Sequence, residues 1–143
     1  MKWHRRFLDL AKFIASWSKD PSTQVGAVIV DGMRRVVGVG FNGFPRGIAD
    51  TEERLNDRPT KYGLIVHAEA NAILNSIGNV QGCVIYCTHI PCTNCAKLII
   101  QAGVSRVCVP SGSFLVTWSA EQDAAMKMFE EAGIAVETIS HGD

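Results

Sequence analysis

The feature that most restricts the fold of this chain is the spacing of one histidine and two cysteines. His67 lies 25 residues before Cys92, and Cys95 follows three positions later in the run PCTNC. Imidazole nitrogen and thiolate sulfur are preferred zinc ligands, and a site with three protein ligands leaves one tetrahedral position open. A cysteine pair at a helix start places both sulfurs within one turn, where free N–H groups favour thiolates. The three residues therefore predict a catalytic metal centre that joins two helix starts.

A carboxylic acid accompanies the predicted metal ligands. Glu69 lies two residues after His67, in the run HAEANAIL. A carboxylate that faces the open position of a metal site, without binding the ion, can move protons during attack on a carbon centre. Glu69 is therefore the candidate general acid and base.

These residues have two simpler interpretations. A closed structural zinc site needs a fourth protein ligand, and the nearest candidates are Cys87 and His89, on one face of the strand-like run CVIYCTHIPC. A redox-active CxxC pair would not require the histidine and glutamate. The complete set of residues favours the catalytic centre over both.

The order of hydrophobic patterns predicts a three-layer α/β/α fold around a central mixed five-stranded sheet, in a single domain spanning residues 1–143. Valine-rich runs on either side of Asp31 and Gly32 favour a tight antiparallel hairpin. The segment 41–62 is rich in charge, proline and glycine and is expected to be an irregular surface loop. Later strands alternate with helices, which favours parallel pairing. The expected helices cover 5–17, 67–76, 93–103 and 119–133, with a Ser119 cap and glycine ends at Gly103 and Gly133, and the later strands cover 82–88, 105–110 and 134–139.

Composition limits the classes of partner. Fourteen basic and fourteen acidic residues cancel, so the chain has no global positive charge with which to hold a nucleic acid. A small anionic ligand needs only a few local donors and remains compatible with that balance. No apolar run reaches the roughly 18 residues of a membrane span, and no signal peptide is apparent. Five cysteines, an odd number, indicate reduced thiols and a cytoplasmic location, with Cys83, Cys87 and Cys108 as buried apolar residues.

The motifs HxE and PCxxC, in HAEANAIL and PCTNCAKLIIQAGVSRV, resemble the cytidine and deoxycytidylate deaminase superfamily, and the likeness extends from Lys19 to Val136. The runs SKDPSTQVGAVIVD, VGVGFNGFPRGI and NDRPTKYGLIVHAE are similar to the deoxycytidylate branch of that superfamily. The resemblance implies one zinc ion per chain and hydrolytic deamination of dCMP to dUMP, which supplies thymidylate synthesis.

The same resemblance implies substrate contacts. Asn42, in the run GFNG, would hold the deoxyribose, and the backbone N–H of Ala68 would bind the pyrimidine carbonyl. Ser18, Lys19 and Arg46 would bind the 5′-phosphate, with Arg46 first because its guanidinium is forked. Each has a simpler alternative, because an asparagine before glycine favours turns and exposed cations are usually solvated.

Regulation and assembly are also implied by resemblance alone. Some deoxycytidylate deaminases are hexamers that dCTP activates and that dTTP with Mg²⁺ inhibits. We therefore expect a homo-oligomer here, with a hexamer as the favoured form, and the same effectors. Two other functions stay open at this point. One is deamination of another cytosine-type or guanine-type nucleoside or nucleotide, and the other is a catalytically silent nucleotide-binding zinc module.

Overall fold

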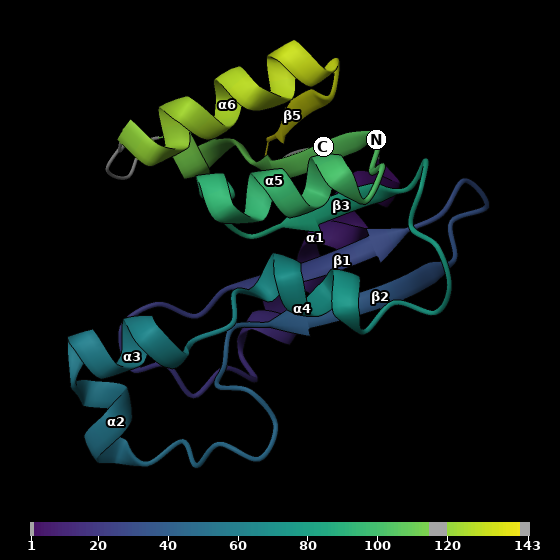
Figure 1. Ribbon diagram of the computed structural model, residues 1–143. Helices are drawn as coiled ribbons and strands as arrows, with labels where there is room; N and C mark the ends of the chain where they lie inside the picture. Colours follow the sequence, from purple (N-terminus) through teal and green to yellow (C-terminus); the bar gives the residue numbers. More distant parts are fainter. Residues whose placement is uncertain (1, 115–119, 141–143) are drawn as a thin grey trace.

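The computed structural model describes residues 2–114 and 120–140, and within them a five-stranded sheet carries helices on both faces (Figure 1). The sheet has the order β2-β1-β3-β4-β5, in which β1 is antiparallel to both neighbours while β3, β4 and β5 are parallel. This arrangement confirms the expected mixed sheet. The strands are β1 (Gly26–Val30), β2 (Val36–Phe41), β3 (Val84–Cys87), β4 (Arg106–Pro110) and β5 (Ala135–Ile139). The helices are α1 (Lys2–Ala15), α2 (Glu52–Asn56), α3 (Arg58–Leu64), α4 (Ala68–Leu74), α5 (Thr93–Gln101), the 3₁₀ turn η1 (Ser111–Phe114) and α6 (Ala120–Ala132).

Each face of the sheet has its own apolar core. On one face, α1 packs Phe7, Leu8 and Ile14 against Val28 and Tyr86. The other face is covered by α4, α5 and α6, as the ribbon shows (Figure 1), and their buried side chains form the larger cluster with β1, β3 and β4. The sheet thus separates α1 from the two helices that begin with the predicted metal ligands.

Two glycines let helices approach the hairpin at backbone distance. A Cβ atom at Gly26 would lie 2.0 Å from the carbonyl oxygen of Ala11, in α1. A Cβ atom at Gly40 would lie 2.3 Å from the nitrogen of Ala72 and 2.4 Å from the carbonyl oxygen of Ala68, both in α4. Side chains other than hydrogen do not fit at such distances, so Gly40 fixes how closely the first turn of α4 lies on β2.

The antiparallel hairpin predicted around Asp31 and Gly32 is confirmed, since β1 and β2 pair antiparallel on either side of it. The carboxylate of Asp31 accepts hydrogen bonds from the backbone N–H groups of Met33 and Arg35, both at 2.9 Å. Arg34 donates its N–H to the Asp31 carbonyl and adopts a left-handed conformation, with φ of 63°. The connection is thus a turn followed by one left-handed residue, and the aspartate side chain holds the N–H groups that follow it.

The segment predicted to be irregular contains the two short helices α2 and α3. Thr51 caps α2 by accepting a hydrogen bond from the backbone N–H of Arg54, and Asp57 caps α3 in the same way from Thr60. These caps satisfy N–H groups that a short helix leaves free, so helices form where the composition favours a loop. The segment 41–62 was therefore predicted wrongly in this part.

The ends of the longer helices follow the sequence more closely. Gly103 and Gly133 have φ of 83° and 76°, as predicted for glycines that end helices. The first helix begins at Lys2 and not at Arg5. The predicted cap Ser119 lies outside the described residues. Across the described ranges, no helix has the length and apolar character needed to cross a bilayer.

Candidate active site

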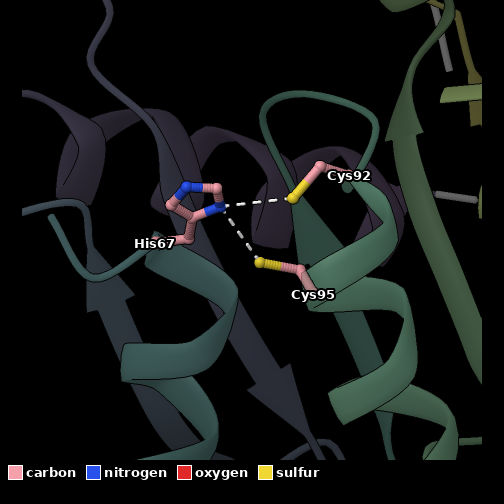
Figure 2. A group of neighbouring side chains, drawn as sticks. All are labelled: His67, Cys92 and Cys95. Atoms are coloured by element: carbon pink, nitrogen blue, oxygen red, sulfur yellow. Dashed lines mark hydrogen bonds between the residues drawn. The ribbon is translucent and has the colours of Figure 1, made fainter. Parts of the chain in front are cut away.

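The three predicted metal ligands converge between the first turns of α4 and α5. His67 is the N-terminal cap residue of α4 and Cys92 that of α5, and neither side chain bonds the helix it precedes. Figure 2 shows the His67 ring directed at both sulfurs, with Nδ1 at 3.3 Å from Sγ of Cys92 and 3.3 Å from Sγ of Cys95. The described part of the chain therefore places one nitrogen and two sulfur ligands around one point, as the sequence predicts.

The spacing of these atoms fits zinc. Zinc–sulfur bonds of about 2.3 Å and zinc–nitrogen bonds of about 2.0 Å at tetrahedral angles place nitrogen and sulfur roughly 3.5 Å apart. The ligand atoms of the three residues lie within 4.8 Å of one another. Neither Cys87 nor His89 joins this group among the described residues, since Cys87 is fully buried and His89 Nδ1 lies 2.9 Å from the hydroxyl of Thr88. The set matches an open three-ligand site and not a closed structural one.

The five cysteines comprise one pair at the candidate metal site and three buried thiols away from it. Hydrogen bonding from Cys95, and then from His67, outweighs burial and lowers the pKa of Cys92 to about 3. The pKa of Cys95 is raised, because the adjacent Cys92 holds the negative charge. A thiolate at the start of α5 also faces free N–H groups of the helix. The thiols of Cys83, Cys87 and Cys108 are buried, and burial raises the pKa of each, as expected for structural cysteines.

Glu69 is buried beside the metal ligands, in the first turn of α4. Its exposed fraction is 4%, and it lines the same cavity as His67 and Cys92. Burial raises the pKa of Glu69 to about 7, with the nearby His67 acting in the opposite direction. A carboxyl group with a pKa near neutrality can both accept and donate a proton, which is what a general acid and base requires.

A cavity of about 360 Å³ leads from these residues to a basic end formed by α3 and the loop after α1. This volume falls in the range of small-ligand sites. Asn42 and Ala68, the two residues predicted to contact the base and sugar of the substrate, both line the cavity. The complete lining is Asp20, Ser22, Thr23, Val25, Asn42, Arg58, Lys61, Tyr62, Ile65, His67, Ala68, Glu69, His89, Ile90 and Cys92.

The amide of Asn42 is held in a single orientation by its neighbours. Its Nδ2 donates to the carbonyl oxygen of Thr23 at 2.9 Å and to Oδ2 of Asp20 at 3.4 Å. Its Oδ1 accepts the backbone N–H of Val25 at 2.9 Å. Both amide protons are therefore in use, and one lone pair of Oδ1 is left to accept a hydrogen bond from a ligand hydroxyl.

The predicted phosphate donors do not line this cavity. Ser18 is buried and donates to the carbonyl of Asn42, Lys19 pairs with Asp50 at 3.2 Å, and Arg46 donates to Oδ1 of Asn75 at 3.1 Å. The structure gives Ser18 a role in holding the Asn42 loop. It does not bring Lys19 or Arg46 to the cavity, so their assignment as phosphate donors stays a prediction without support from this geometry.

Sequence reasoning missed the residues at the basic end of the cavity. Lys61 and Asp20 form a buried ion pair, 3.1 Å from Nζ to Oδ1, with 6% of each side chain exposed. Burial raises the pKa of Asp20, but hydrogen bonds from the N–H groups of Ser22 and Thr23, and from Lys61, outweigh it and keep that pKa below its usual value. Arg58 and Lys61 are three apart in the run RPTKY, and the helix α3, which the sequence pattern did not predict, places both on one face.

A second group of possible metal ligands lies on the other face of the sheet. His4, Cys108 and Glu137 have ligand atoms within 4.8 Å of one another. His4 Nδ1 is 2.8 Å from the hydroxyl of Tyr86, and Glu137 pairs with Arg106 at 3.3 Å. These contacts describe a hydrogen-bonded network that ties α1 to the sheet, and the guanidinium of Arg106 opposes a cation there.

Comparison with known proteins gives one family. The family described as the cytidine and deoxycytidylate deaminase zinc-binding region matches residues 1–111. A deaminase from the luxG 3′ region of Aliivibrio fischeri is 47% identical over 137 residues, covering 94% of this chain and 92% of that protein. Human deoxycytidylate deaminase is 42% identical over 142 residues, covering 94% of this chain and 78% of the human protein. The crystal structure of the dCMP deaminase of cyanophage S-TIM5 in complex with dCMP and dUMP has a TM-score of 0.78 at 25% identity, covering 96% of this chain and 97% of the phage protein.

Proposed function

The chain belongs to the cytidine and deoxycytidylate deaminase family, and from this membership we propose that it is a zinc-dependent deaminase that converts dCMP and water into dUMP and ammonia. The observation that carries the proposal is the placement of Glu69. It is a buried carboxyl group at the same end of a nucleotide-sized cavity as His67, Cys92 and Cys95. That combination supplies a proton carrier next to an open metal site.

Three residues would bind the metal ion, and a fourth transfers the protons of the reaction. His67, Cys92 and Cys95 would hold the zinc ion, which when bound lowers the pKa of a water molecule toward neutrality. Glu69 accepts a proton from the attacking water and delivers it to N3 as the new bond forms at C4. Glu69 then takes the second proton from the hydroxyl group now on C4 and carries it to the amino group, which leaves as ammonia when the bond between C4 and that nitrogen breaks. The atoms balance as one water consumed and one ammonia released.

The remaining cavity residues orient the nucleotide. Ala68 is the first residue of α4, and the first N–H groups of a helix have no carbonyl partner within it, so the backbone N–H of Ala68 is left to bind the pyrimidine carbonyl. The spare lone pair of Asn42 Oδ1 would accept a hydrogen bond from the deoxyribose hydroxyl. Both roles place the reacting carbon between Glu69 and the metal ligands.

Ammonia release by the zinc-loaded protein tests the function. The substrates are dCMP, deoxycytidine, CMP and dCTP at equal concentrations, and a preference for dCMP is the expected result. Turnover of another of these compounds alone would agree with the metal chemistry but would exclude dCMP as the substrate. Silence on all four, with zinc bound, would refute deamination of cytosine nucleotides and favour the catalytically silent zinc module.

Assembly and control follow the family resemblance. We propose that the chain forms a homo-oligomer in the cytoplasm and that the favoured form is a hexamer. We also propose that dCTP activates the enzyme and that dTTP with Mg²⁺ inhibits it. Sedimentation of the zinc-loaded protein, together with dCMP assays in which dCTP, dTTP and Mg²⁺ are added separately, tests both parts.

A further inference from the structure

The basic end of the cavity carries two cations, and only one of them is neutralised. Lys61 is buried, pairs with Asp20 at 3.1 Å and donates to the hydroxyl oxygen of Ser22 at 3.3 Å. Its charge is thus compensated within the protein. Arg58 lies at the start of α3, is exposed, and makes no ion pair or side-chain hydrogen bond with the described residues.

Free hydrogen-bond donors line the same cavity as Arg58. The Ser22 hydroxyl oxygen accepts from Lys61, so its own proton remains to be donated. The backbone N–H groups of Ser22 and Thr23 are already bound to Asp20, at 2.8 and 3.2 Å. The donors left for an anion are therefore the guanidinium of Arg58, the nearby hydroxyl groups and the third N–H of Lys61, a set suited to a phosphate monoester.

We propose that Arg58 determines specificity, by binding the 5′-phosphate and so making the cavity select a nucleoside monophosphate over the free nucleoside. The inference rests on the proposed function and refines it. Lys61 acts beside it as a positioning residue, because its pair with Asp20 joins α3 to the turn that carries the hydroxyl donors. Arg46, the cation that the sequence favours for this role, is bound to Asn75 outside the cavity.

The test compares kcat/KM for dCMP and for deoxycytidine in the wild-type holoenzyme and four variants, Arg58→Gln, Arg58→Lys, Arg54→Gln and Arg46→Gln. Arg58→Gln is expected to lower kcat/KM for dCMP by about 10- to 100-fold, mainly through KM, because it removes a charge-assisted hydrogen bond. Deoxycytidine turnover should change less than about 2-fold. Arg58→Lys keeps the charge and should recover part of the loss. Arg54→Gln removes a cation of the same segment that lies outside the cavity, and it should match wild type.

The possible results distinguish failure of the Arg58 inference from failure of the proposed function. Equal losses for dCMP and deoxycytidine in Arg58→Gln would show a structural role and overturn the inference. A selective loss in Arg46→Gln, with Arg58→Gln unaffected, would also overturn it. Wild-type protein that holds zinc but does not convert dCMP would remove the proposed function, and this inference with it. Zinc content and thermal midpoint, measured for every variant, verify that the exposed substitutions leave the fold intact.

Discussion

Adding a single methyl group at Gly40 should disturb the active centre through the packing of α4. The new Cβ would lie 2.3 Å from the nitrogen of Ala72 and 2.4 Å from the carbonyl oxygen of Ala68. Ordinary contact begins near 3.4 Å, so the helix backbone must retreat by about 1 Å. Overpacking costs about 1–3 kcal/mol, and both obstacles are backbone atoms that cannot rotate away. A displacement of about 1 Å at a catalytic group can lower turnover by roughly 100-fold.

Three measurements test the expected effects of Gly40→Ala on stability, zinc affinity and turnover. Urea unfolding of the zinc-loaded protein reports the stability loss, chelator competition reports zinc affinity, and ammonia release reports turnover. All three should fall together, because α4 carries His67 at its start and Glu69 in its first turn. Gly32→Ala is the matched control, since a Cβ there meets no atom within 4 Å, and its stability should stay within about 0.5 kcal/mol of wild type. Wild-type stability and turnover in Gly40→Ala would refute the packing argument.

Three further predictions concern ionisable groups of the cavity. Glu69→Gln should keep its zinc and lose about 100- to 10,000-fold in turnover, whereas Cys92→Ala should lose both zinc and turnover; an active Glu69→Gln enzyme would exclude Glu69 as the proton carrier. Lys61→Met should cost about 3–5 kcal/mol in urea unfolding, because Asp20 is left as an unpaired buried charge, and a loss below about 1 kcal/mol would contradict that reasoning. The pKa of Asp20 in the folded protein is below its unfolded value of 3.8, so its stabilising contribution is complete above pH 3.8 and is lost as pH falls through the folded pKa; acid unfolding of Asp20→Asn should lack this component.

The sequence predicted the metal ligands well because their signal is local. A histidine or cysteine at a helix start needs only the helix pattern behind it, and both α4 and α5 have that pattern. The parallel pairing of the later strands was accessible for a similar reason, since helices between those strands favour parallel neighbours.

The basic end of the cavity was not accessible from sequence, because it depends on contacts between distant segments. Lys61 and Asp20 are 41 residues apart, and nothing in either local run indicates that they pair. Arg58 was hidden by the composition of the segment 41–62, which favours a loop although Asp57 caps a helix there. Arg46 has the right chemistry for phosphate, but only the folded chain shows that its guanidinium lies elsewhere. Local pattern was therefore enough to predict the candidate metal ligands and proton carrier, and tertiary structure was needed to find the residues proposed here to bind the phosphate.

The distribution of the five cysteines gives the protein an internal chemical reporter of its metal content. Cys83, Cys87 and Cys108 are buried, so thiol reagents do not reach them in the folded chain. The other two sulfurs are the predicted ligands, and a thiolate committed to zinc is a poor nucleophile toward such reagents. Native holoenzyme should thus titrate with close to no reactive thiols, and each equivalent of zinc withdrawn by a chelator should expose one fast-reacting pair. A colorimetric thiol count would then measure the metal-free fraction of any preparation before activity is assayed.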